Sequence, residues 1–73
     1  FYQGLINLQL LDISNNQFTK LPESLCKLIN LQNLNISFNI NLKKLPKDIG
    51  ELQNLTILDL TNTLTWISEK KKI

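Results

Sequence analysis

One short motif occurs three times along this chain, and its spacing limits the folds that the chain can adopt. The tetrapeptide Leu5-Ile6-Asn7-Leu8 recurs at 28–31 and, as Leu-Gln-Asn-Leu, at 52–55, with offsets of 23 and 24 residues. Periods of about 20 to 50 residues are typical of proteins that stack one small unit on the next. The motif therefore predicts a pile of similar coils rather than a single layered domain.

The residues between these tetrapeptides also repeat in kind and in place. Each unit contains spaced apolar residues, one asparagine and a Leu-Pro pair. The first unit contains Leu8, Leu11, Ile13, Asn16, Phe18, Leu21, Pro22, Leu25 and Leu28. The second contains Leu31, Leu34, Ile36, Asn39, Leu42, Leu45, Pro46, Ile49 and Leu52, with one residue inserted after the asparagine. A third unit begins with Leu55, Leu58 and Leu60.

Two periodicities alternate within each unit. Apolar and polar residues alternate at 10–14, 33–37 and 57–61, which predicts three short strands with one buried face each. Because each strand lies one coil after the last, neighbouring strands should pair in parallel. The apolar residues around 22–29 and 46–53 follow helical spacing instead, so a short helix or a 3-10 turn is expected there.

Prolines and asparagines stand at the boundaries of these elements. Pro22 and Pro46 suit the first position of a helix, where a backbone N–H is not needed. Asn16 and Asn39 lie where the chain should turn away from its strand. An amide at that point can satisfy buried backbone groups, which an apolar side chain cannot.

This frame resembles that of the leucine-rich repeat family from residue 5 to about residue 67. The Leu-Pro pairs make it similar to the 23-residue intracellular type. The resemblance implies an α/β fold, a leucine-rich repeat solenoid with parallel strands on the concave face and short helices or 3-10 turns on the convex face. It divides the chain into leucine-rich repeats over 1–67, about three coils with the first incomplete and the last degenerate, and a basic tail over 68–73.

The third coil loses the frame after Leu60. Thr63 stands where the earlier units have their asparagine, and a one-residue deletion that gives this role to Asn62 is the alignment we prefer. About three repeats are the minimum for a stable stack. We therefore expect residues 1–73 in isolation to be partly unfolded or self-associating. In the native setting, further repeats or a partner should cover one or both ends.

The composition leaves little room for catalysis. The chain has no histidine, so the commonest general base and the triads that need it are missing. Cys26 is the single cysteine, which rules out an intrachain disulfide and a cysteine-based zinc site. The only glycines, Gly4 and Gly50, form no phosphate-binding loop. We predict no enzymatic activity, no cofactor, no metal and no small-molecule substrate.

The charge and hydropathy patterns also bear on partners. The net charge is +2, and three of the eight lysines are Lys70, Lys71 and Lys72 in the tail. This balance lacks the clustered basic face of a nucleic-acid-binding protein. No apolar run approaches the roughly 18 residues of a membrane span. We therefore expect neither nucleic acid nor membrane as a partner.

Residues between the buried leucines should point outward from the concave face in lateral rows. The candidate partner-binding residues are Leu10, Asn33 and Ile57 in a first row, Asp12, Asn35 and Asp59 in a second, Ser14, Ser37 and Thr61 in a third, and Phe38 in a fourth with Asn15 and Asn62. The two acids of the second row, roughly 10 Å apart by strand spacing, could suit an inverting glycosidase. Carboxylates that face solvent or a partner are the interpretation we favour.

Such a face fits a protein partner with a basic or amide-rich edge, although a merely solvated face would look the same. The family resemblance implies a protein–protein interaction module that binds a partner on the concave face. Two alternatives stay open: a non-catalytic structural component of a large assembly, and the repeat segment of a multidomain signalling protein such as a kinase. The partner could be another protein or neighbouring repeats of a longer chain. We expect a cytoplasmic location, because extracellular members of the family usually carry cysteine-bonded caps.

Overall fold

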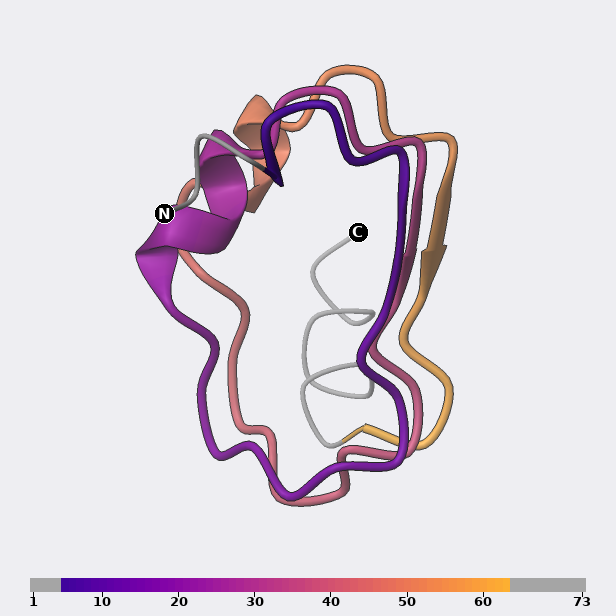
Figure 1. The fold of residues 1–73 in the computed structure, drawn as a ribbon. Coiled ribbons are helices and arrows are strands. Elements are labelled where there is room, and N and C mark those ends of the chain that lie inside the picture. The colour runs from indigo at the N-terminus through magenta and orange to yellow at the C-terminus, as the bar shows by residue number, and fades with distance from the viewer. Residues whose placement is uncertain (1–4, 64–73) are drawn as a thin grey trace.

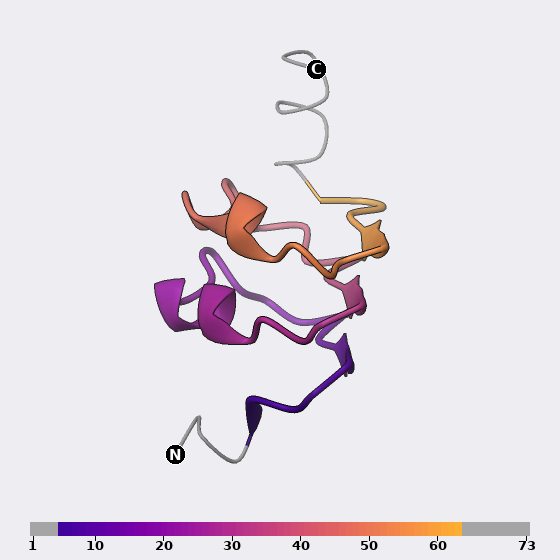
Figure 2. The same ribbon diagram turned by 90° about the horizontal axis from the view of Figure 1, so that it is seen from above.

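The computed structural model describes residues 5–63, which make about two and a half turns of a coil that repeats every 23 or 24 residues. Three strands lie on one side of the coil, and two 3-10 helices lie on the opposite side. In chain order the elements are β1 (Leu10–Asp12), η2 (Glu23–Lys27), β2 (Asn33–Asn35), η3 (Ile49–Glu51) and β3 (Ile57–Asp59). Seen along the stack, the coils nearly superimpose (Figure 1), and the view at right angles shows them as successive layers (Figure 2).

The strands form one parallel sheet in the order β1-β2-β3, as the repeat predicts. Leu11 pairs with Leu34 and Leu34 with Leu58, so equivalent residues of each unit lie side by side. Each strand begins where the alternation predicts and is three residues long. The expected strands were two residues longer, because the alternation continues into a turn that leaves the sheet.

That turn has the same backbone conformation in every coil. Asn15, Phe38 and Asn62 have φ angles of 58°, 60° and 59°, in the left-handed region. A positive φ reverses the chain direction sharply, and it is uncommon outside glycine and asparagine. The three equivalent residues therefore end the strands and direct the chain toward the far side of the coil.

The side opposite the sheet carries short 3-10 helices of five and three residues rather than longer helices. The expected ranges, 22–29 and 46–53, shrink to η2 and η3, which both have the tighter 3-10 geometry. Each proline carbonyl accepts a bond from the third residue on: Pro22 from the Leu25 N–H and Pro46 from the Ile49 N–H, both at 3.1 Å. Helices with 3-10 geometry are usually only a few residues long.

The core lies between the sheet and the 3-10 helices and is densest in the middle coil. Leu31, Leu34, Ile36 and Leu42 have no exposed surface. Equivalent residues of the outer coils, such as Leu11 and Leu58, are only partly buried. Each coil thus depends on its neighbours for burial, as expected for stacked repeats.

Asparagine amides connect neighbouring coils. The asparagine of the recurring tetrapeptide donates to a carbonyl of the preceding coil: Asn30 Nδ2 to Ile6 O and Asn54 Nδ2 to Ile29 O, both at 2.8 Å. The frame asparagine Asn39, which is fully buried, donates to Ile36 O at 2.7 Å and across to Ile13 O at 3.0 Å. These bonds confirm the expected role of the asparagine at the turn, and they explain why the residue recurs.

The preferred alignment of the third coil is wrong. Thr63, not Asn62, takes the asparagine position: it is 2% exposed, and its hydroxyl donates to Leu60 O at 2.9 Å. Asn62 is exposed at the left-handed turn position instead. The coil keeps its full length up to this point because a threonine hydroxyl can replace the amide donor. The end of the third coil, to residue 67, and the basic tail over 68–73 lie outside the described residues.

Candidate partner-binding face

The outward side of the sheet, called the strand face below, carries the candidate residues in lateral rows. The register aligns Leu10, Asn33 and Ile57 across the three strands, and Asp12, Asn35 and Asp59 one step further on. The first two expected rows are thus adjacent in space, although their members are 23 or 24 residues apart in the sequence. Strand spacing of about 4.8 Å separates neighbours within a row.

The second row is held by the same local hydrogen bond in each coil. A side-chain oxygen of Asp12, Asn35 and Asp59 accepts the backbone N–H two residues later, in each case at 3.0 Å. This Asx turn closes the end of the strand. Asp12 Oδ1 also accepts the Ser14 hydroxyl at 2.6 Å. The row therefore has a structural role, and one oxygen of each side chain is already engaged.

These bonds keep the two acids ionised. The side-chain hydrogen bond from Ser14, followed by its backbone N–H, lowers the pKa of Asp12. Thr61 lowers the pKa of Asp59 in the same way, with its side chain as the largest cause. The neighbouring charge of Asp12 works in the opposite direction on the pKa of Asp59 but is the smallest cause. The second row therefore carries two fixed negative charges on the strand face, with the neutral amide of Asn35 between them.

Apolar side chains flank these charges and remain open to solvent. Leu10 is 60% exposed, Ile57 54% and Phe38 47%. Single exposed apolar residues are ordinary on protein surfaces. Here, however, Leu10 and Ile57 belong to one row and lie next to the acidic row, so apolar and charged groups share one face.

The remaining candidates contribute unequally to this face. Thr61 is exposed, whereas Ser14 and Asn33 are partly buried. Ser37 is only 5% exposed, which leaves it little surface for a partner. Its backbone is engaged instead, with its N–H bonded to Asn35 Oδ1 and its carbonyl accepting the Asn15 N–H at 2.9 Å.

Phe38 is the least expected residue of the face in conformational terms. It has a positive φ where the equivalent positions are asparagines. The left-handed conformation costs a bulky residue about 1–2 kcal/mol. The ring remains about half exposed, so burial within this chain offsets only part of that cost. Backbone strain of this kind is concentrated at functional sites.

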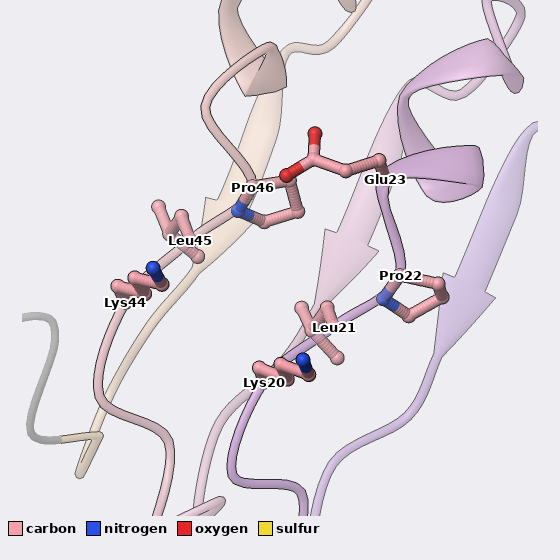
Figure 3. Close-up of a pocket in the computed structure, with 7 residues that line it drawn as sticks. All are labelled: Lys20, Leu21, Pro22, Glu23, Lys44, Leu45 and Pro46. Atoms are coloured by element: carbon pink, nitrogen blue, oxygen red, sulfur yellow. The ribbon is translucent and has the colours of Figure 1, made fainter.

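A second surface was missed by the sequence analysis. The segments 17–22 and 40–47 link the strand turns to the 3-10 helices and carry four lysines; we call them the lysine flank. A hollow of about 230 Å³ lies between them, as Figure 3 shows. Its lining is Lys20, Leu21, Pro22, Glu23, Lys44, Leu45 and Pro46. The signal for this surface in the sequence is the repeated triplet Lys-Leu-Pro at 20–22 and 44–46.

The described residues also include metal-ligating side chains and one thiol. Within residues 5–63, no three metal-ligating side chains gather in one place. Cys26 is buried on the helical side, and burial, with the charges of nearby acids, raises the pKa of its thiol. A thiol with a raised pKa is a poor nucleophile. Over the same residues, no helix is long and apolar enough to cross a membrane.

Comparison with known proteins agrees with this repeat geometry. The family model described as Leucine Rich Repeat matches residues 7–28 and 30–52, more than half of the chain. The chain belongs to the leucine-rich repeat family. The two matched segments correspond to the two complete units of the sequence frame.

Relatives of this leucine-rich repeat chain are much longer proteins. It is 42% identical over 64 residues to the disease resistance protein UNI of Arabidopsis thaliana, covering 86% of the chain and 7% of the relative. A probable disease resistance protein of the same plant is 40% identical over 69 residues, 93% of the chain and 9% of the relative. A leucine-rich repeat serine/threonine-protein kinase of Mus musculus is 37% identical over 54 residues, 74% of the chain and 3% of the kinase. The chain thus corresponds to a small part of each relative.

Proposed function

We propose that this chain is a non-catalytic interaction segment that binds a protein partner through its strand face. Leucine-rich repeats of this kind are typically interaction modules, and the matched relatives include resistance proteins and a kinase. We also propose that the coils form part of a solenoid of the 23-residue intracellular type, with the strand face on its concave side. The observation that carries the proposal is the fixed register of exposed apolar and ionised residues on the strand face.

The charge of the face indicates the chemistry of the partner. The segments 8–16, 31–39 and 55–63, which carry the strands and their turns, contain two charged residues, Asp12 and Asp59, both acidic. A partner that presents a cationic side chain flanked by apolar groups would complement them. Such complementarity steers association and fixes the bound orientation, while the apolar contacts with Leu10 and Ile57 supply buried area.

The structure suggests a test that leaves the fold intact. Asn35 makes the same Asx bond as its two acidic neighbours, so Asp12→Asn with Asp59→Asn should retain the turns while removing both charges. The control pair, Asp48→Asn with Glu51→Gln, removes the same charge from exposed residues on the helical side. Each pair is introduced into the full-length protein, and partners recovered from native cells are quantified by mass spectrometry.

We expect the recovery of at least one partner to fall about tenfold with the strand-face pair and to stay unchanged with the control pair. Close interfacial charge pairs are worth upwards of about 1.5 kcal/mol. Equal recovery with both pairs would contradict the proposal and favour a structural component of an assembly.

The matched kinase and resistance proteins favour a second candidate, the repeat segment of a multidomain signalling protein. The partner surface would then lie in another domain of the same polypeptide, and crosslinks from the strand face would stay within one chain. A cytoplasmic location is part of the proposal, and fluorescence microscopy of the tagged full-length protein tests it.

A further inference from the structure

The charged residues of the described coils are sorted by sector. The strand sector, residues 8–16, 31–39 and 55–63, has only acids among its charged residues. The helical sector, residues 23–30 and 48–54, has three acids and one lysine. The lysine flank between them holds the other four lysines and no acid: Lys20, Lys43, Lys44 and Lys47. The flank therefore has a charge opposite to that of both neighbouring sectors. This separation is hidden by the low net charge of the chain.

These lysines are not neutralised within the fold. Among residues 5–63, none of the four forms an ion pair or a side-chain hydrogen bond. Lys20 and Lys44 occupy equivalent places on neighbouring coils, and Figure 3 shows their side chains extending alongside each other. A backbone bond from the Lys43 N–H to Thr19 O, 3.3 Å long, keeps the two segments adjacent. Lys20 and Lys44 therefore present two like charges on adjacent segments, with no ion-pair partner among residues 5–63.

The hollow between the two segments combines apolar and charged lining residues. Leu21, Leu45 and the two prolines are apolar, while Lys20 and Lys44 supply positive charge. One acid, Glu23, also lines the hollow. A ligand therefore needs an apolar group for the apolar part of the lining, anionic groups for the two lysines, and no negative charge next to Glu23.

We propose that the lysine flank is a second docking surface, which binds an acidic segment of a partner protein by placing an apolar side chain in the hollow and carboxylates against Lys20 and Lys44. The surface is separate from the strand face and does not depend on it. A protein segment fits better than a nucleic acid, because carboxylates can be spaced to avoid Glu23, whereas a phosphate backbone carries a charge at every step. The chain also has no arginine, the residue best suited to hold phosphate through two hydrogen bonds.

The test uses the full-length protein and a labelled peptide, Glu-Glu-Leu-Glu-Glu, followed by fluorescence anisotropy at low salt. Binding should be lost when the peptide carries glutamine in place of glutamate. Lys20→Gln with Lys44→Gln should weaken binding about tenfold, within the range for two exposed ion pairs. The matched control, Lys43→Gln with Lys47→Gln, removes the same charge from lysines that do not line the hollow, and it should weaken binding by less than about threefold.

A charge reversal separates docking from a folding effect. Lys20→Glu with Lys44→Glu should abolish binding of the acidic peptide and create binding of Lys-Lys-Leu-Lys-Lys, which a misfolded chain would not do. Equal losses for the two glutamine pairs would overturn the proposal, because the attraction would then be diffuse. Tighter binding of a ten-nucleotide oligothymidylate than of the peptide would overturn it in favour of nucleic acid. Carbodiimide crosslinking in native cells should join Lys20 or Lys44 to a carboxylate of a second polypeptide, and links only within the same chain would contradict the proposed source.

Discussion

Replacing Asn39 by aspartate tests whether its buried amide holds the coils together. The side chain is fully buried, and its Nδ2 faces three carbonyl oxygens, of Ile13, Ile36 and Ser37, at 2.7–3.4 Å. Its own Oδ1 has no hydrogen-bond partner. Asn39→Asp keeps the shape but replaces the donor by an oxygen. An ionised carboxylate would then face three acceptors without water, so the new side chain must be protonated in the folded state.

The loss of folding stability in this variant is the free energy needed to keep the new carboxyl protonated. An aspartate has an ordinary pKa of about 3.9, and holding it neutral at pH 7 costs about 4 kcal/mol at 1.36 kcal/mol per pH unit. Because the folded pKa of the variant carboxyl is raised, its stability is greatest at low pH and is lost as pH rises. The penalty relative to the natural chain should therefore shrink by about 2.7 kcal/mol between pH 7 and pH 5. A protonated carboxyl could still donate to Ile36 O.

The assay is urea unfolding of a stably folded stretch of the protein that contains residues 1–73, at pH 5 and pH 7. Asn16→Asp is the matched control: Asn16 also donates to Ile13 O, at 2.9 Å, but it is exposed. It should cost less than about 1 kcal/mol at either pH, since a surface side chain can stay ionised. An Asn39→Asp penalty that does not change with pH, or a control that costs as much, would refute the inferred role of the buried amide.

Three further predictions concern the strand face and the stability of the stack. Phe38→Asn should change the free energy of unfolding by less than about 1 kcal/mol, because relief of left-handed strain offsets the lost half-burial of the ring. The same variant should weaken partner binding. A loss of stability larger than 2 kcal/mol by urea unfolding, roughly the whole burial energy of a ring, would disprove this balance. Because the pKa values of Asp12 and Asp59 are lowered in the fold, the two ionised carboxylates stabilise it above about pH 4, and this stabilisation is lost as pH falls through the folded pKa values. Asp12→Asn with Asp59→Asn should therefore flatten the acid limb of the plot of unfolding free energy against pH. An unchanged acid limb would argue against this contribution. Residues 1–73 alone should be partly unfolded or self-associating by sedimentation and thermal unfolding, whereas a monomer with a cooperative transition above about 60 °C would show that the coils suffice by themselves.

The sequence predicted the parts of the fold that depend on periodicity. The strand starts, their parallel pairing and the lateral rows follow from alternation and from the repeat offset, because equivalent residues of stacked coils must lie side by side. The role of Asn39 was also predictable, since an asparagine at a buried turn has few other purposes. The strand ends were not, because a phenylalanine such as Phe38 rarely adopts the left-handed conformation that its aligned asparagines adopt.

The errors arose where one side chain can replace another. Thr63 supplies the donor that Asn39 supplies in the coil before it, and only the geometry shows that a hydroxyl reaches the same kind of carbonyl. Ser37 has the polarity of a surface residue, yet its place in the middle coil buries it. The lysine flank was missed because its four cations are spread over two segments, which the coil brings together.

Site-specific photocrosslinking from two isoleucines compares the strand face directly with the opposite side. Ile57 on the strand face is 54% exposed and Ile29 on the helical side is 51% exposed, so a photoreactive phenylalanine analogue at either position has similar access to solvent. Each variant of the full-length protein is irradiated in native cells, and its adducts are identified by mass spectrometry. Our account predicts a discrete adduct with a second protein from position 57, lost when Asp12→Asn and Asp59→Asn are added, and none of that mass from position 29. Adducts of equal yield from both positions, or adducts from position 29 alone, would contradict the assignment of the strand face as the binding surface.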